Sequence, residues 1–531
     1  MEKRPADKKW KYMNDTIKTR LKKNSLTNII YFVVTLPIIF ILTPIILQFV
    51  GKEVYGIWVI TGTILIFLDL FGGSSSFSAL GIIIPGYDPK KEPEEINKIV
   101  NTLFVFHLFT ALFFAVLYLL AKDEIVSMFF KVDSALLSEV YFVLGVSVFL
   151  FLFNFVMLSF CYLLLGFNVL YPINIVHTVA AYARAAFMVW VLYAGYGIHG
   201  IVVVQMGTII LETITVLFIV KRVYPPLVFN PLMFSVKRLR IILTLSIKLF
   251  VTRAAQLVNY NADKLILGYF INPVMAAYYQ IGAGITKYIS LVPEMLGMNS
   301  LLAAAAELKK NRQQDKIYML YDRVSKYIFF AGFLPACGIV IFGSEFIGLW
   351  LGTGYENVYL VMVFLAAGCL YGTAAYPAVN ILNGLGRVNG PMIINSAAMA
   401  VNITLSIVLT VKYGLAGALS ATVISIFLGT SAVCLLFFVS MKHLPRFDVI
   451  FLKPAVSAAA AFAVNAGLEG VLGQAGGWAV LILKITVFSA VYIAVSVFVL
   501  KHFDEKDKSL VKGIFAAKKE EKQSGSAEKK D

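Results

Sequence analysis

The chain has 531 residues, of which 59% are hydrophobic and only 14% are charged, and its mean hydropathy is +0.82. This much apolar surface excludes a soluble globular protein, because a membrane-spanning helix needs about 20 apolar residues and the chain supplies such runs repeatedly. We attribute the net charge of +16 to membrane topology and to attraction for anionic lipid, and we expect no nucleic-acid partner.

The hydropathy pattern predicts an all-α polytopic membrane protein with about 14 transmembrane helices. Backbone polar groups must be satisfied internally in lipid, so apolar runs of this length form helices. The predicted spans cover residues 28–49, 55–85, 99–121, 139–165, 171–194, 198–220, 241–261, 265–302, 327–349, 357–383, 391–411, 414–440, 454–472 and 478–500.

Basic residues fall in alternate gaps between these spans. Of the 46 Lys and Arg residues, 36 lie in the even-numbered gaps and at the two ends of the chain. Because Lys and Arg close to spans stay in the cytoplasm, both termini are predicted to be cytoplasmic, which requires an even number of spans. The opposite gaps hold few basic residues: Lys52, Lys122, Lys131, Lys264 and Lys412.

A weak internal repeat predicts two six-helix lobes. Tyr196-Gly197 recurs as Tyr413-Gly414 after 217 residues, and Leu165-Gly166 recurs as Leu385-Gly386 after 220. Repeats of the same topological sense place a substrate site at the lobe interface near mid-membrane. The expected domains are a basic N-terminal segment (1–27), an N-lobe (28–220), a cytoplasmic linker (221–240), a C-lobe (241–440), spans 13 and 14 (441–502) and a charged cytoplasmic tail (503–531).

Buried cations are the first candidates for a substrate site, because a charge inside a membrane is costly. Arg184 and Arg253 lie roughly 18 Å from the cytoplasmic ends of their spans, and Lys287 roughly 22 Å. Three cations at similar depth suit an anionic substrate, and the guanidinium fork suits a phosphate. Lys248 is a weaker candidate that can reach the cytoplasmic surface, and Lys484 is interpreted as an anchor near the outer end of span 14.

Acidic residues in the spans are candidates for coupling to H+ or Na+, or for charge neutralisation. For Asp69 and Glu212 we favour neutralisation of a buried cation. Glu294 lies seven residues after Lys287 on the same helix face, so a loose or water-bridged pair is an alternative there. Asp263 is interpreted as interfacial, at the outer end of span seven.

The sequence offers no catalytic or metal-binding pattern. His107, His177 and His199 are scattered and are interpreted as isolated polar packing residues, and the four cysteines give no reason to expect disulfides. Nucleotide-binding motifs are absent from the sequence, and every gap is short. A transporter is therefore favoured over an enzyme, with no cofactor beyond a coupling ion.

Three segments resemble a known family. VGKEVYGIW (50–58), NADKLILGYF (261–270) and YGLAGA (413–418) resemble, in order and position, the Wzx-type (O-antigen flippase-like) polysaccharide flippases. These belong to the multidrug/oligosaccharidyl-lipid/polysaccharide (MOP, MATE-like) exporter superfamily. The first span carries no charged residue, whereas lipid II flippases keep an Arg-Asp pair there, which argues against that branch. Ala303–Glu307 also lacks the proline common after span eight.

The resemblance implies a two-lobed bundle in the bacterial inner membrane, with a cationic cavity. It implies translocation of a lipid-linked oligosaccharide, usually linked through undecaprenyl diphosphate, for cell-surface polysaccharide biosynthesis. Its partners would be this substrate, membrane lipids and polysaccharide-assembly proteins. The alternatives are an ion-coupled multidrug or metabolite antiporter of the same superfamily and a membrane glycan polymerase. The polymerase is disfavoured because the sequence has no large outer loop.

Overall fold

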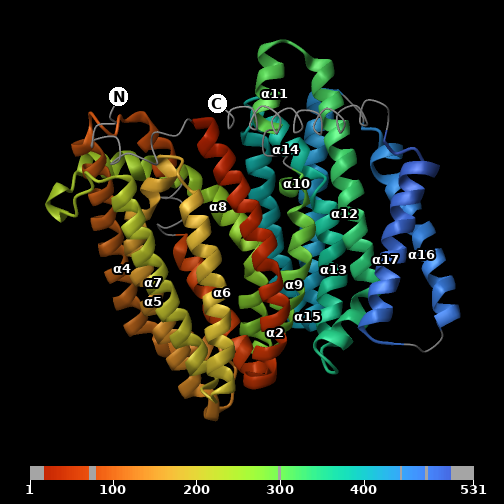
Figure 1. Ribbon diagram of the computed structural model, residues 1–531, viewed down its shortest axis with the longest axis horizontal. Helices are drawn as coiled ribbons and strands as arrows, with labels where there is room; N and C mark the ends of the chain where they lie inside the picture. The colour runs from red at the N-terminus through yellow and green to blue at the C-terminus, as the bar shows by residue number, and fades with distance from the viewer. Residues whose placement is uncertain (1–16, 71–78, 297–300, 443–444, 473–475, 504–531) are drawn as a thin grey trace, which may run out of the picture. The chain divides into compact units, whose positions relative to one another are not determined.

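The computed structural model describes residues 17–70, 79–296, 301–442, 445–472 and 476–503 (Figure 1). These residues form helices and turns without any strand, which confirms the predicted all-α class. Most of the basic N-terminal segment, nearly all of the charged tail and the Gly-Gly-Ser-Ser-Ser run at 72–76 lie outside the described residues.

Ten helices among the described residues are long and apolar enough to cross a membrane, which confirms a multi-pass membrane protein. Two of them, α2 (Ile17–Asp69) and α15 (Asn389–Met441), each hold two of the predicted spans. The chain leaves helical geometry within them at Gly51 (φ 77°) and Gly414 (φ 59°). Glycine adopts this left-handed region without a steric penalty, so each glycine joins two spans through a sharp bend.

The other helices follow the predicted order. They are α4 (Pro93–Phe129), α5 (Leu137–Gly166), α6 (Tyr171–Tyr193), α7 (Gly197–Val223), α8 (Val236–Phe270), α9 (Pro273–Ser290), α10 (Val292–Met295), α11 (Leu301–Lys310), α12 (Gln314–Trp350), α13 (Glu356–Gly372), α14 (Ala375–Gly384), α16 (Lys453–Leu472) and α17 (Trp478–Ala494). Short helical turns lie at Ile84–Gly86, Ser134–Leu136, Pro231–Met233, Asp448–Leu452 and Val495–Val499.

The predicted boundary between spans seven and eight is wrong. Helix α8 continues to Phe270 without a break, and α9 begins at Pro273. The prediction placed a gap at Asp263 and Lys264 because both residues are charged. In the structure these side chains are only 1% and 7% exposed, and internal partners satisfy them.

The chain forms two compact units. The first comprises Met1–Gly282 with Asn395–Ser425, and the second comprises Ala283–Ile394 with Ile426–Asp531. These borders differ from those of the predicted lobes, and the two-lobe division itself stays a prediction. One marker pair of the repeat shares local geometry: Gly197 and Gly414 both have positive φ (51° and 59°). In the other pair Gly386 has positive φ (78°) and Gly166 does not.

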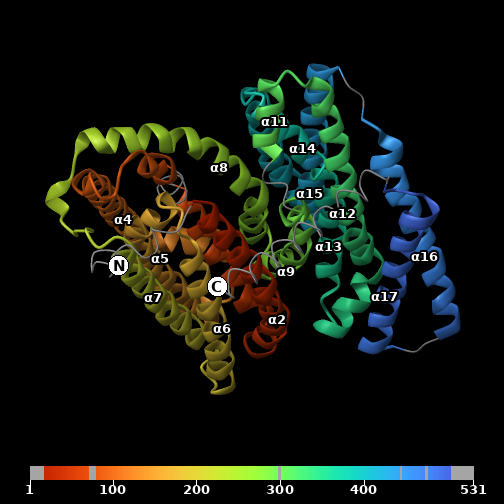
Figure 2. The same cartoon turned by 45° about the horizontal axis from the view of Figure 1, so that its top comes forward.

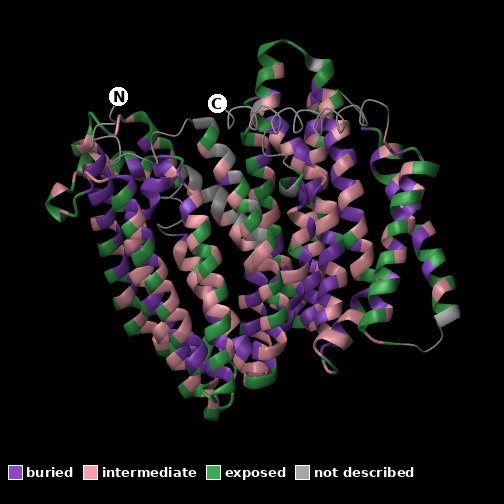
Figure 3. Ribbon diagram, in the orientation of Figure 1, coloured by how far each residue is buried: buried purple, intermediate pink, exposed green. Residues whose placement is uncertain are grey.

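In the first unit α4, α5, α6 and α7 run side by side, and α2 packs along α6 (Figures 1 and 2). Burial is concentrated between these helices, while apolar side chains on their outer faces are exposed (Figure 3). Apolar side chains exposed on the outside of a helix bundle suit helices whose outer faces meet lipid.

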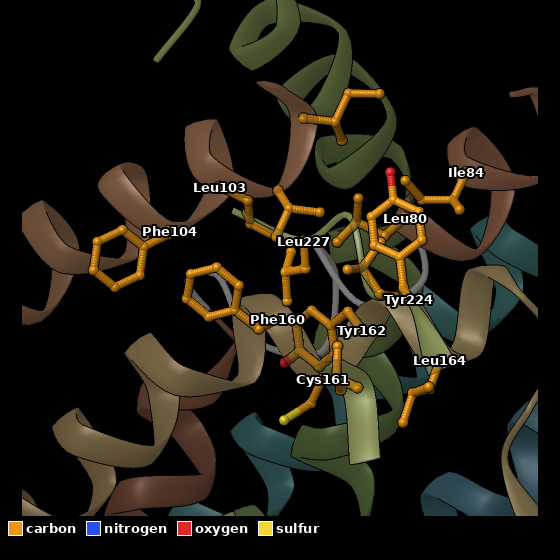
Figure 4. Close-up of a cluster of buried hydrophobic side chains, with 14 of the residues drawn as sticks. Leu80, Ile84, Leu103, Phe104, Phe160, Cys161, Tyr162, Leu164, Tyr224 and Leu227 are labelled. Carbon is orange, nitrogen blue, oxygen red and sulfur yellow. The ribbon is translucent and has the colours of Figure 1, made fainter. Parts of the chain in front are cut away.

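A core of the first unit lies where α4, α5 and the segment after α7 meet. Leu103, Phe160 and Tyr224 gather around Leu227, and all four are buried (Figure 4). Burial raises the pKa of the Tyr224 phenol to about 12, so the hydroxyl stays protonated and donates to the Pro93 carbonyl oxygen at 3.2 Å. This core fixes the ends of α4 and α7.

Two asparagines on α4 hold the linker that follows α7. The Asn97 side chain donates to the Pro226 carbonyl (2.9 Å) and accepts from the Val228 N–H (2.9 Å). One helical turn later, Asn101 donates to the Val228 carbonyl (2.7 Å) and accepts from the Asn230 N–H (2.8 Å). Each amide therefore pairs with the linker backbone as a neighbouring β-strand would. Two of the basic gaps that the topology predicts on one side are joined in this way.

In the second unit a three-residue ion cluster ties α12, α16 and α17 together. The Lys484 ammonium group lies 3.0 Å from Glu345 and 3.2 Å from Glu469, and Lys484 is only 9% exposed. The interpretation of Lys484 as an interfacial anchor is therefore wrong. Phe342 and Phe488 pack nearby in an edge-to-face contact with ring centroids 5.7 Å apart.

Candidate functional site

Of the predicted substrate-binding cations, Arg253 and Lys248 lie on α8, but their side chains are outside the described residues. Lys287 lies on α9, is exposed, and sits over the Tyr288 ring at 5.6 Å. Glu294 lies on α10 and is also exposed. The described side chains of Lys287 and Glu294 form no direct ion pair with each other. Their roles remain predictions.

Arg184, the fourth predicted cation, lies on α6 and faces α7. Its Nη2 donates to Glu212 Oε2 at 2.8 Å, and its Nε donates to Thr208 Oγ1 at 3.0 Å. Thr208 and Glu212 are four residues apart on α7, so both face the same way. Its guanidinium is therefore held in place by one helix face.

Glu212 has a second partner, His177. The imidazole Nδ1 of His177 makes a short contact with Glu212 Oε1. The interpretation of His177 as an isolated packing residue is therefore wrong. The same holds for His199, whose Nδ1 lies 3.3 Å from Glu139 Oε2. His107 is a polar packing residue, as predicted: it is buried, and its Nδ1 lies 2.7 Å from Ser159 Oγ. We call Arg184, Glu212, His177 and Thr208 the Arg184 cluster.

The Arg184 cluster is neutralised from within. A carboxylate shared between a guanidinium and an imidazole offsets the arginine's charge, and this is the arrangement that the neutralisation hypothesis for Glu212 describes. The side chains of Arg184 and Glu212 are 28% and 13% exposed, whereas that of His177 is 44% exposed. Polar groups at membrane depth face protein or a water-filled cavity, so the more exposed imidazole indicates an aqueous side to the cluster.

A second polar site in the first unit centres on Asp263 of α8. Its carboxylate accepts hydrogen bonds from Tyr279 Oη (2.6 Å), from Ser406 Oγ (2.9 Å) and from Thr422 Oγ1. These donors lie on α9 and α15. The prediction that Asp263 lies at the end of span seven is wrong, because α8 continues past it to Phe270. The residue is buried and tied to two other helices, and its interfacial depth stays a prediction.

Asn402 completes this site. Its Nδ2 donates to Thr422 Oγ1 at 3.3 Å, whereas its Oδ1 is buried and has no hydrogen-bond donor among the described residues. An unsatisfied buried acceptor in a cluster that also holds a carboxylate is a feature of cation sites, because a bound cation uses such oxygen atoms as ligands. We call Asp263, Tyr279, Asn402, Ser406 and Thr422 the Asp263 cluster.

Lys264 supplies only part of the compensating charge for Asp263. It attracts the carboxylate electrostatically, but its Nζ donates to Asn261 Oδ1 at 2.9 Å. The hydroxyl groups are neutral. The cluster therefore favours the uptake of a small cation or a proton. Within the described residues, no group of three or more His, Cys, Asp or Glu side chains is placed to hold a metal ion.

Asp69, the other predicted acid, ends α2 and is half-buried. It lies close enough to Tyr162 of α5 for an electrostatic interaction. Neither coupling nor neutralisation is decided by this placement, and its role stays a prediction.

A family model identifies the protein family of the chain. A model of the family "Polysaccharide biosynthesis protein" matches residues 45–360, which is more than half of the chain, so the chain belongs to this family. No curated protein sequence matches. The predicted link to polysaccharide biosynthesis is confirmed by this family.

Solved structures show the same fold. The lipid II flippase MurJ in an inward closed conformation is 16% identical, has a TM-score of 0.72, and is similar over 89% of this chain and 99% of its own. An inward-facing multidrug resistance MATE transporter of the MOP superfamily is 15% identical, with a TM-score of 0.56 over 78% of this chain and 98% of its own. The outward-facing form of a MATE transporter gives 0.53 at 14% identity, over 82% and 98%. At these identities the likeness shows the fold alone.

Proposed function

We propose that the protein is a flippase that moves a lipid-linked oligosaccharide across the bacterial inner membrane by alternating access, for cell-surface polysaccharide biosynthesis. The family supports a polysaccharide pathway, and the structural neighbour MurJ is named for a lipid-linked substrate. The observation that carries the proposal is Arg184, a charged guanidinium on a membrane-spanning helix with a carboxylate as its partner.

The substrate class follows from charge. An undecaprenyl-diphosphate linkage is anionic, and a guanidinium binds phosphate oxygens through a planar fork of donors. In this proposal Arg184, with Arg253 and Lys248, holds the diphosphate while the prenyl chain stays in the bilayer. Lys287 is a further candidate cation. The protein then moves its substrate without changing any covalent bond.

Charge reversal tests the cationic site. Arg184→Glu, Arg253→Glu and Lys287→Glu are each expected to lower surface glycan display in a deletion strain, at matched protein level. Lipid-linked oligosaccharide should accumulate in the inner leaflet. Lys412→Glu is the matched control, since this exposed lysine lies outside the predicted spans. Normal display in all three variants would remove the cationic site, and altered drug susceptibility instead would favour an antiporter.

The coupling ion belongs, in this proposal, to the Asp263 cluster. A buried carboxylate with hydroxyl and amide oxygens around it suits either Na+ or a proton. Binding there changes how α8, α9 and α15 are held together, which is the kind of two-state element that ion-driven transport needs. Transport by Asp263→Asn should lose its dependence on the ion gradient.

A further inference from the structure

The Arg184 cluster has a feature that a plain cationic site does not need. The substrate's phosphate and the Glu212 carboxylate are chemically equivalent partners for a guanidinium, because both offer anionic oxygens to the same N–H donors. Glu212 already takes Nη2 of Arg184 at 2.8 Å. An incoming phosphate has to displace Glu212 before it binds Arg184 through its fork.

Glu212 is arranged so that displacement leaves it with a partner. Its Oε2 faces Arg184, while its Oε1 contacts His177 Nδ1. A carboxylate abandoned in a membrane would be strongly destabilising. Because the imidazole remains on the other oxygen, the carboxylate can leave Arg184 without becoming unpaired.

We propose that Glu212 is an internal competitor that occupies Arg184 in the absence of substrate and passes to His177 when a substrate phosphate binds. This inference rests on the proposed function, since it assumes a phosphate-bearing substrate. Its consequence is a site tuned for moderate affinity. Glu212 returns to Arg184 as the phosphate leaves, so release is assisted by the same residue that opposed binding.

His177 sets the balance of this competition, because it is the partner that Glu212 keeps. Helix α6 packs against α2 and α7. Among the described residues, His177 lies beside the Tyr31 ring of α2, with ring centroids 6.3 Å apart, and contacts Glu212 of α7, while Arg184 lies two turns along α6. Without the imidazole, Glu212 would become unpaired on leaving Arg184 and would oppose anion binding more strongly.

The experiment measures equilibrium binding of a farnesyl diphosphoryl hexose to the full-length protein in detergent. The probe is a diphosphate diester, so it carries the anionic oxygens that the proposal requires. Glu212→Gln keeps the side-chain shape but removes the competing charge, and it is expected to lower Kd by about tenfold. Arg184→Gln should raise Kd. Glu139→Gln is the matched control, because this carboxylate pairs with His199 in the same unit and should leave Kd unchanged.

His177→Leu is a second, independent variant. It removes the partner of Glu212 Oε1, so Glu212 depends on Arg184 alone and the Kd for the probe is expected to lie above the wild-type value. This variant decides the question even where Glu212→Gln does not fold.

The outcomes separate two failures. Unchanged or weaker binding by Glu212→Gln, with Arg184→Gln still weakened, overturns the competitor and leaves the flippase proposal standing. A Kd of His177→Leu at or below the wild-type value also overturns it. Failure of both the wild type and Glu212→Gln to bind the probe overturns the substrate class itself, and the competitor falls with it.

Discussion

Glu212 and Asp263 are both carboxylates in the helical interior of the first unit, yet they are stabilised in opposite ways. Glu212 lies between a guanidinium and an imidazole, and the Arg184 guanidinium compensates its charge. Asp263 is held by three hydroxyl groups, which satisfy its lone pairs but add no charge. Hydrogen bonding and charge compensation are separate requirements. Arg184 meets both for Glu212, whereas the hydroxyl groups around Asp263 meet only the first.

The contrast assigns different ligands to the two clusters. A carboxylate that already has cationic partners acts on whatever competes for them, so the Arg184 cluster responds to anions. A carboxylate with hydroxyl partners retains an incompletely compensated negative charge, so the Asp263 cluster responds to cations. Four measurements test this difference between the two clusters.

The largest effect is expected from Asp263→Leu. Tyr279, Ser406 and Thr422 lose their shared acceptor in a buried setting, so the free energy of unfolding should fall by about 4 kcal/mol. Thermal unfolding of the purified protein in detergent measures this. Asp133→Leu, in an exposed loop, is the control and should change it by less than about 0.5 kcal/mol. A stable Asp263→Leu variant would show that the hydroxyl cage is not stabilising.

Sodium should stabilise the wild type through the Asp263 cluster. At a hundredfold excess over Kd, a single bound ion adds about 2.7 kcal/mol, seen as a higher unfolding temperature than in potassium. Asp263→Asn should lose this response, and Glu212→Gln should keep it. If instead sodium has no effect on the wild type while acid stabilises it through Asp263, the coupling ion is a proton.

Breaking the Arg184 cluster should have a smaller effect on stability. Glu212→Leu leaves Arg184 without its carboxylate, but the guanidinium side chain is 28% exposed and regains some solvation. We expect a loss of about 1–2 kcal/mol. A double-mutant cycle with Arg184→Leu isolates the pair, and a coupling energy near zero would contradict the pairing.

The smallest effect concerns the orientation of Arg184. Thr208→Val removes the acceptor of its Nε and should lower the free energy of unfolding by about 0.5–1 kcal/mol. It should also weaken anion binding, because the fork is less well aligned. Thr215→Val on the same helix is the control, since its hydroxyl donates to the Leu211 carbonyl and faces outward. Equal effects in the two variants would remove the positioning role of Thr208.

The helical architecture was predictable because spanning a membrane imposes a length and a composition that the sequence displays directly. The wrong predictions came from charged residues that were taken to mark a gap between spans. Asp263 and Lys264 implied a gap in the membrane region, yet α8 passes through them. The local sequence does not indicate the partners of Asp263, since Ser406 and Thr422 lie 143 and 159 residues away and are ordinary helix residues in sequence.

The Arg184 cluster was half predictable. Depth alone suggested that Glu212 neutralises a buried cation, because each residue could be counted from the end of its span. Its imidazole partner could not be found this way, since a lone histidine has no spacing pattern to reveal it. The pairing depends on which faces of α6 and α7 meet, and that is a property of packing.

The contacts of Asn97 and Asn101 on α4 with the linker that follows α7 affect how the membrane topology can be mapped. Reporter fusions are usually placed in hydrophilic loops, and the segment at 226–230 looks suitable by polarity. An insertion there would break four hydrogen bonds to Asn97 and Asn101 and detach the loop from its helix. The exposed turn at 311–313, between α11 and α12, is held by local backbone hydrogen bonds and is the better insertion site.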